Sequence, residues 1–195
     1  MKVVLRPVLN WQLMAASVRC NHPGGVLETA RLILRPPQDT DLKALARLYA
    51  MPEVGNSLKL GVLTPQATAE LLSDYLHMWF EHGFGTRMIL DKTDMGFMGE
   101  VGLRLHDRTG EPAMRYALHP DFWGQGFAGE SVAATVDDAF GCIGLERVDA
   151  FSRDSNKGSL RILEKAGAQM TETTEIPTGI LYKYSFFRND WLTRA

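Results

Sequence analysis

The sequence has few of the features that mark specialised classes of protein. It has only two cysteines among 195 residues, Cys20 and Cys142, too few for a disulfide framework, which favours free thiols. No apolar run approaches the roughly 20 residues that a membrane-spanning helix needs, and residues 1–23 lack the Ala-x-Ala site of a signal peptide. The net charge is only −2, which gives no basic surface for nucleic acid. We therefore expect a cytoplasmic chain without nucleic-acid or membrane partners.

Patterns of metal ligands and of a catalytic serine are also missing. No GxSxG elbow occurs in the chain. His77 and His82 are five residues apart, which puts them on different faces of a helix, and none of the histidines has the spacing of metal ligands. The five are His22, His77, His82, His106 and His119. We expect no metal site.

What is present indicates one globular domain. Hydrophobic residues make up 45% and charged residues 23% of the chain, which are ordinary globular values, and the length suits a single core. Residues 1–26 lack sustained periodicity and include the turn-forming stretch Asn21–Gly25. We therefore divide the chain into an N-terminal extension, residues 1–26, and a single domain, residues 27–195.

Hydrophobic periodicity predicts a mixture of strands and helices. Thr64 and Pro65 have the residue types of a helix cap and first turn, and Gly83 is typical of a helix end. Tyr75 and Trp79 lie one turn apart on that helix and fit core packing; resemblance to a known family implies the border of the acceptor cleft as the alternative. Alternation predicts strands at residues 28–35, 85–91, 97–105, 114–118, 147–152 and 180–187, and spacing predicts helices at 40–49, 64–82, 131–140 and 156–167.

The stretch Leu118–Glu130 is the most informative part of the chain. Gly124, Gly126 and Gly129 lie between a predicted strand and a predicted helix. Glycines there allow a ligand to approach bare backbone N–H groups, and the start of a helix favours an anion such as a phosphate. The stretch predicts a site for a phosphate-bearing ligand, although a glycine-rich turn without a ligand has the same letters.

Two kinds of phosphate loop match these letters. Gly124-x-Gly126-x-x-Gly129 fits the dinucleotide fingerprint, and Asp149 lies at the position of a ribose-binding acid. An NAD(P)-binding oxidoreductase is one interpretation, although Pro120–Trp123 separates strand from glycines and little chain follows. The segment Trp123–Ala128 also resembles the pyrophosphate loop of the GNAT superfamily of acyl-CoA transferases, in its RimJ/RimL-like branch.

The resemblance to the GNAT family extends over residues 28–192. Residues 28–35 resemble the opening strand of that branch, residues 99–103 its "iGxvGL" strand and residues 153–168 its "N-x-x-S-x-x-x-L-E-K-x-G-F" helix, with Ala168 in place of Phe. A further departure is Met114-Arg115, where a Gly-Tyr-type pair is common. The family implies an α+β fold, with a mostly antiparallel sheet, helices on both faces, and splayed central strands at residues 114–118 and 147–152.

The resemblance also implies a cofactor site. Acetyl-CoA would be the co-substrate, with the backbone of the loop around its pyrophosphate and the strand end beside its pantetheine. The implied cofactor-binding residues are Ala117, Leu118, Trp123, Gly124, Gln125, Gly126, Phe127, Ala128, Gly129 and Asn156.

For catalysis, the resemblance implies that Ser159 donates a proton to the leaving thiolate and that Asn156 orders the pantetheine or a water. Both residues also fit the first turn of a helix, with Asn156 as the cap. The tyrosine donor of many superfamily members would fall near Leu163 and is absent. Glu172 is the first candidate for the base and Glu100 the second; each also fits a solvated surface carboxylate.

The sequence therefore predicts an acetyl-CoA-dependent N-acetyltransferase that acts directly on a primary amine. The branch favours a protein N-terminal α-amine, and a small-molecule amine is the alternative. A non-catalytic acyl-CoA sensor shares the fold, but Asn156 and Ser159 favour an enzyme. We expect a monomer or a homodimer.

Overall fold

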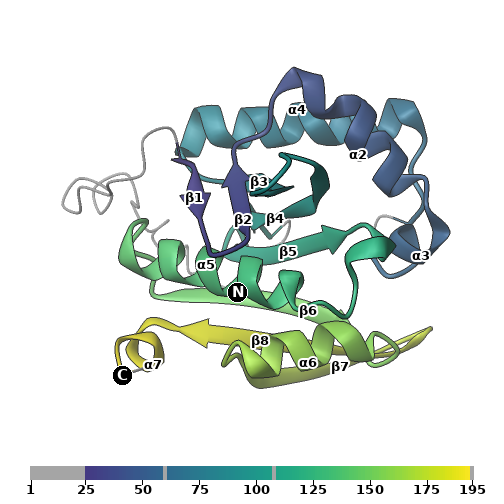
Figure 1. Ribbon diagram of the computed structural model, residues 1–195. Helices are drawn as coiled ribbons and strands as arrows, with labels where there is room; N and C mark the ends of the chain where they lie inside the picture. The colour runs from purple at the N-terminus through teal and green to yellow at the C-terminus, as the bar shows by residue number, and fades with distance from the viewer. Residues whose placement is uncertain (1–24, 59–60, 107–108, 194–195) are drawn as a thin grey trace, which may run out of the picture.

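The computed structural model describes residues 25–58, 61–106 and 109–193, and in this part of the chain eight strands form one sheet (Figure 1). The strand order is β1-β2-β3-β4-β5-β6-β8-β7. The strands are β1 (Leu27–Glu28), β2 (Leu32–Arg35), β3 (Thr86–Asp91), β4 (Phe97–Leu105), β5 (Pro112–Leu118), β6 (Arg147–Arg153), β7 (Gln169–Ile176) and β8 (Gly179–Phe187).

The sheet is antiparallel at every pairing of the described strands except one. β5 and β6 run parallel, while the six other pairs are antiparallel. A parallel pair needs a long crossover, and here helix α5 (Phe127–Gly141) supplies it. The predicted α+β class with a mostly antiparallel sheet is confirmed.

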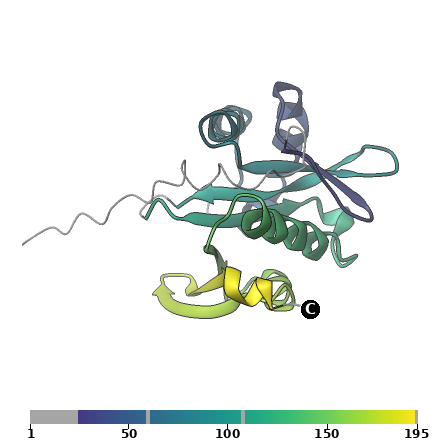
Figure 2. The ribbon, with the colours of Figure 1, turned by 90° about the vertical axis from the view of Figure 1, so that its left-hand side faces the viewer.

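Helices cover both faces of the sheet, as Figure 2 shows with α2 and α4 on one side and α5 on the other. The helical segments are η2 (Asp39–Asp41), α2 (Leu42–Tyr49), α3 (Pro52–Gly55), α4 (Pro65–His82), η3 (Pro120–Phe122), α5, α6 (Lys157–Lys165) and α7 (Arg188–Leu192). Both predicted ends of α4 are confirmed, since Thr64 Oγ1 accepts from the Ala67 amide at 3.2 Å and Gly83 is left-handed at φ 69°.

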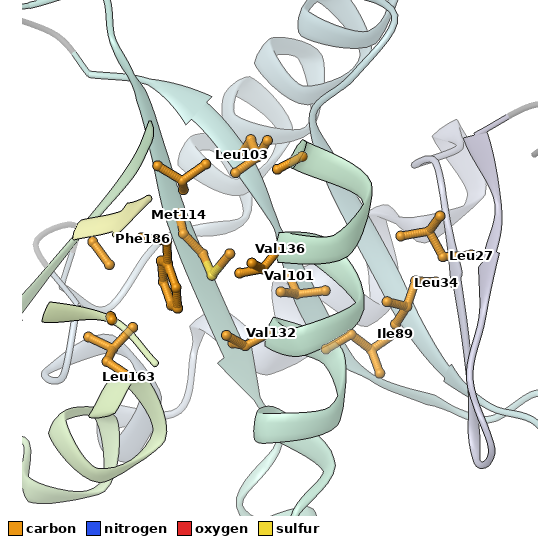
Figure 3. Packing of buried hydrophobic residues seen from close by; sticks show 14 of the residues in the cluster. Leu27, Leu34, Ile89, Val101, Leu103, Met114, Val132, Val136, Leu163 and Phe186 are labelled. Atoms are coloured by element: carbon orange, nitrogen blue, oxygen red, sulfur yellow. The ribbon is translucent and has the colours of Figure 1, made fainter. Parts of the chain in front are cut away.

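The main core lies between the sheet and α5. Val132 and Val136 of α5 are fully buried against Val101 and Met114 of the central strands (Figure 3). Phe186 of β8 and Leu163 of α6 continue the same core toward the last strands. This packing holds α5 across the point where the parallel pair begins.

A buried ion pair also fixes α5 to the sheet. Arg87 of β3 donates to Asp138 of α5 at 2.7 Å, and the two side chains are only 3% and 6% exposed. Burial lowers the pKa of Arg87, against the opposing effect of the Asp138 carboxylate. A second guanidinium bond, to Gly25 O at 2.7 Å, links the start of the described chain to the same pair.

Two predicted boundaries were wrong and one strand was missed. Residues 28–35 form two strands, because Thr29 makes a turn in which its hydroxyl accepts from the Leu32 amide at 2.9 Å. The helix predicted at 131–140 begins at Phe127, so the last glycine of the loop lies in its first turn. Strand β7 was missed because it is an exposed edge strand, whose polar residues show no apolar alternation.

The expectation of free thiols was also wrong for Cys142, which is disulfide-bonded. Cys20 lies outside the described residues, as do residues 1–24 of the predicted extension. No helix among the described residues is long and apolar enough to cross a membrane.

We predict that Asp138→Asn lowers the free energy of unfolding by about 3–5 kcal/mol, because it leaves the Arg87 charge buried without its partner. Asp137→Asn is the matched control: Asp137 is the preceding residue, is exposed and accepts from Trp191 Nε1 at 2.6 Å, which an amide oxygen can also do. Urea unfolding measures both variants. Equal stability of the two would contradict the importance of the buried pair.

Candidate functional site

The sheet opens between its two parallel strands. β5 and β6 each have seven residues, yet their register covers only Ala113 with Asp149 and Met114 with Ala150. Beyond this point the strands diverge, as predicted for residues 114–118 and 147–152. The divergence leaves part of the β5 edge without a neighbouring strand.

The backbone of β5 can be assigned to the two sides of this opening. His119 N–H donates to Met98 O at 2.8 Å. In an antiparallel pair every second residue bonds the same neighbouring strand, so the backbone N–H and C=O groups of Ala117 also point to β4. The N–H groups of Tyr116 and Leu118 then face the opening, beyond the last paired residue. Leu118 O is already taken by Trp123 Nε1 at 2.9 Å. Of the two predicted backbone contacts, Leu118 faces the opening and Ala117 faces the sheet.

The glycine loop follows directly at the end of β5. Gly124 and Gly126 are left-handed, at φ 75° and 84°, a region that favours glycine. The first amide bonded within α5 is Glu130 N–H, to Gly126 O at 3.1 Å. The amides of Phe127, Ala128 and Gly129 precede it and emerge from the helix start. The loop therefore presents donors at the positive end of the helix dipole, which suits an anion.

Two side chains of the β1–β2 hairpin region hold the loop in place. Arg31 donates to Gln125 O at 3.0 Å and to Glu130 Oε2 at 2.7 Å, and its guanidinium lies 4.2 Å from the Phe127 ring centre. Thr29 Oγ1 donates to Glu130 Oε1 at 2.6 Å. Burial works to raise the pKa of Glu130, but hydrogen bonds from Thr29 and Arg31 outweigh it and lower that pKa. The loop is thus held in place by residues between strands β1 and β2, at one edge of the sheet.

On the α5 side, the opening is bordered by the start of α6. Asn156 Oδ1 accepts from the Ser159 amide at 3.0 Å, so Asn156 is the helix cap, one of its two predicted roles. The Ser159 hydroxyl lies 2.8 Å from the hydroxyl of Tyr116, which the sequence analysis did not single out. Alternation along β5 could have found it, because it puts Tyr116 on the same face as Met114 and Leu118.

On the opposite face, Glu100 lies in a buried polar cluster. Its carboxylate accepts from the Tyr49 hydroxyl at 2.5 Å and from Arg115 Nε at 3.1 Å, and Glu100 is 0% exposed. Arg115 also bonds the hydroxyls of Tyr49 and Tyr75. Burial and the Glu100 charge raise the pKa of both tyrosines. Tyr75 therefore packs in the core and also supports this cluster.

The cluster is not fully satisfied. Glu100 Oε2 and Arg115 Nη1 are buried and have no hydrogen-bond partner among the described residues. Burial opposes the charge of Arg115, but the Glu100 carboxylate outweighs it and raises the pKa of Arg115. Glu100 is thus held as an ion pair and is not a free carboxylate.

Glu172 lies apart from these groups, on the exposed edge strand β7. It pairs with Lys183 of β8, which pairs with Phe151 of β6. Directly opposed residues share a face, so Glu172 and Phe151 lie on the face of Arg115 and Glu100. Two strands separate Glu172 from β5. The structure therefore places both candidate bases on one face and Ser159 on the other.

The dinucleotide interpretation requires a parallel sheet, and this sheet is antiparallel apart from the β5–β6 pair. Asp149 is 4% exposed and is engaged by Ser185, Arg147 and Lys183 at 2.7, 3.1 and 3.0 Å. It is not available to a ribose, so that interpretation was wrong. In the described part of the chain, no group of three or more His, Cys, Asp or Glu side chains is placed to hold a metal.

Comparison with known proteins agrees with this geometry. The family model described as "Acetyltransferase (GNAT) domain" matches residues 31–169, more than half of the chain. The "Uncharacterized N-acetyltransferase YoaA" of Bacillus subtilis (strain 168) is 28% identical over 165 residues, which cover 83% of this chain and 88% of that protein.

Solved structures share the fold. A GNAT-family acetyltransferase from Bacillus anthracis superposes with a TM-score of 0.74 at 19% identity, over 84% of this chain and 99% of that one. The ribosomal-protein-S5-alanine acetyltransferase from Vibrio fischeri gives a TM-score of 0.70 at 17% identity, over 85% and 98%.

We predict that Asn156→Ala lowers the free energy of unfolding by about 1 kcal/mol, the usual cost of losing a helix cap. Asn156→Asp keeps a side-chain oxygen for the Ser159 amide, so its stability stays within about 0.5 kcal/mol of the wild type. Urea unfolding separates the two. An alanine variant as stable as the aspartate variant would show that the cap does not stabilise α6.

Proposed function

The chain belongs to the GNAT acetyltransferase family, and on that premise we propose that it transfers the acetyl group of acetyl-CoA directly to a protein N-terminal α-amine. That it is an N-acetyltransferase follows from the family; the acceptor, the RimJ/RimL-like branch and the residue roles are the proposal. The observation that carries it is the glycine loop at the start of α5, adjoining the unpaired edge of β5.

The residues at the opening fit acetyl-CoA. A Cβ added at Gly124 or Gly129 would meet no atom within 4 Å, so there is room beside the loop for a ligand. We assign the pyrophosphate to the amides of Gly124 through Gly129, with Trp123 flanking them. The N–H groups of Tyr116 and Leu118 would bond the pantetheine and the thioester carbonyl. When bound, acetyl-CoA supplies the activated acyl group.

On the α6 side, Ser159 would donate a hydrogen bond to the sulfur as the C–S bond breaks. Asn156 holds the Ser159 backbone, so it positions this donor as well as capping the helix. Donors fixed in advance at a developing charge cost no reorganisation during the reaction. We assign the proton-accepting role to Glu172, because Glu100 is occupied by Arg115 and Tyr49.

An α-amine is chemically the easier acceptor. Its pKa of about 7.7–8.0 leaves roughly a tenth neutral at pH 7, against well under 0.1% for a lysine near 10.4. A modest, solvent-exposed carboxylate such as Glu172 then suffices as the base. The Vibrio fischeri structure with this fold is named for a ribosomal-protein alanine acceptor, which supports the same class. A small-molecule amine is the alternative, to be decided by acceptor screening.

We predict that the midpoint of thermal unfolding rises with acetyl-CoA and with free CoA but not with NADPH, because only a ligand of the native state stabilises it. Gly126→Asp should abolish this rise, since it puts a left-handed non-glycine residue and a negative charge at the anion site. Gly144→Asp is the control: Gly144 is also left-handed, at φ 77°, with open space around it, but lies after α5. If CoA still raised the unfolding midpoint of the Gly126→Asp variant, the loop would not be part of the CoA site.

We predict that Glu172→Gln lowers kcat for an N-terminal peptide acceptor at least tenfold, because a general base typically contributes about 10²–10⁴-fold to the rate. Glu175→Gln is the matched control, because Glu175 is exposed on the same strand but on its opposite face. Steady-state rates with a panel of peptides and small amines measure both. Unchanged kcat in the Glu172 variant would eliminate it as the base.

A further inference from the structure

The hydroxyl of Tyr116 is placed to act on Ser159. It comes from β5, while Ser159 comes from the first turn of α6, and the two oxygens are 2.8 Å apart. Tyr116 OH also lies 3.4 Å from Ser159 O, so the serine Oγ is the nearer of two acceptors within reach of its single hydroxyl hydrogen. The pair spans the opening between β5 and β6 at its α6 side.

The chemistry of the two hydroxyls sets the direction of their bond. A phenol is a much stronger acid than an aliphatic alcohol, so Tyr116 is the better donor and Ser159 Oγ the better acceptor. Burial raises the pKa of Tyr116 to about 12, with the hydrogen bond to Ser159 acting in the opposite direction. Tyr116 therefore keeps its proton at neutral pH, and we take its hydroxyl as the donor to Ser159 Oγ, the nearer acceptor.

We propose that Tyr116 is a positioning residue that fixes the Ser159 hydroxyl, so that the serine hydrogen points into the opening at the sulfur of CoA. The inference rests on the proposed function and adds to it a residue from a different element. The serine hydroxyl can otherwise rotate freely. Accepting from Tyr116 uses one of its lone pairs and leaves its own hydrogen directed away from the tyrosine.

Tyr116 orients the donor but does not give up its proton. During transfer the amine nitrogen forms a bond to the acetyl carbon, and the C–S bond breaks with its electron pair on sulfur. The amine's proton goes to the base, and the thiolate, held by the Ser159 hydrogen, takes its proton from solvent. A thiol has a pKa of about 8.5, whereas that of Tyr116 is about 12. Full transfer from Tyr116 to the thiolate is therefore unfavourable.

The chain offers a matched control for the structural part of this contact. Tyr184 of β8 donates its hydroxyl to Glu164 Oε1 at 2.9 Å, and Glu164 lies on α6 five residues after Ser159. Both tyrosines thus attach the same helix to the sheet. Only Tyr116 bonds the residue assigned to the thiolate. A comparison of variants that lack one hydroxyl or the other therefore separates the anchoring of α6 from the orientation of Ser159.

The test compares Tyr116→Phe, Tyr184→Phe, Ser159→Ala and the double variant Tyr116→Phe/Ser159→Ala. We expect Tyr116→Phe to lower kcat about tenfold, less than the loss of a direct donor, with the KM for acetyl-CoA within about twofold. Tyr184→Phe should retain wild-type kcat. In the Ser159→Ala background, Tyr116→Phe should have no further effect, because its action passes through the serine. Full additivity, or an equal loss in Tyr184→Phe, would overturn the proposal.

A second measurement does not depend on turnover. The ultraviolet absorbance of the thiolate follows the ionisation of free CoA bound to the protein. A serine hydrogen aimed at sulfur stabilises the thiolate, so the bound thiol should ionise at lower pH in the wild type than in Tyr116→Phe. The same midpoint in both would overturn the inference. A wild type that binds CoA but acetylates no amine would contradict the proposed function alone, since the thiol titration would still report on Tyr116.

Discussion

The early end of pairing between β5 and β6 is the constraint on which the site depends. Two register pairs hold these strands together. Beyond them, the backbone N–H groups of Tyr116 and Leu118 on β5 have no neighbouring strand to bond. Lost ladder hydrogen bonds are unfavourable unless another group replaces them. The main core and the Arg87–Asp138 pair hold α5 across the divergence, so the open edge persists. The glycine loop at the start of α5 then lies at the end of that edge.

The opening joins two chemically different faces. On one face, the hydroxyls of Tyr116 and Ser159 meet beside α6, where we propose that negative charge develops on sulfur. On the other face, Glu100 and Arg115 form a buried ion pair that is hydrogen-bonded to tyrosines of α2 and α4. A buried pair of this kind adds little net stability but is costly to break. It fixes these two helices to the sheet, while Glu172, the base that we propose, lies farther out, on β7.

Local patterns in the sequence predicted the parts of the fold and site that depend on neighbouring residues. Thr64, Pro65 and Gly83 set the ends of α4, and Gly124 and Gly126 predicted the left-handed turns before α5, because these conformations depend on single residue types. Local patterns do not predict which residues far apart in the chain meet across the sheet. Tyr116 meets Ser159 across 43 positions of the chain, and Arg115 meets Glu100 only after β4 and β5 pair. β7 was missed because an exposed edge strand needs no apolar face.

The central claim is that acetyl-CoA binds along the open edge of β5 with its pyrophosphate on the loop before α5. Amide hydrogen exchange, resolved by residue with and without acetyl-CoA, tests it most directly. We expect the ligand to protect the amides of Tyr116 and Leu118 together with those of residues 124–129, while the amide of Ala117, already directed to β4, changes little. Binding without protection at these amides, or protection confined to another part of the sheet, would show that acetyl-CoA does not bind along this edge.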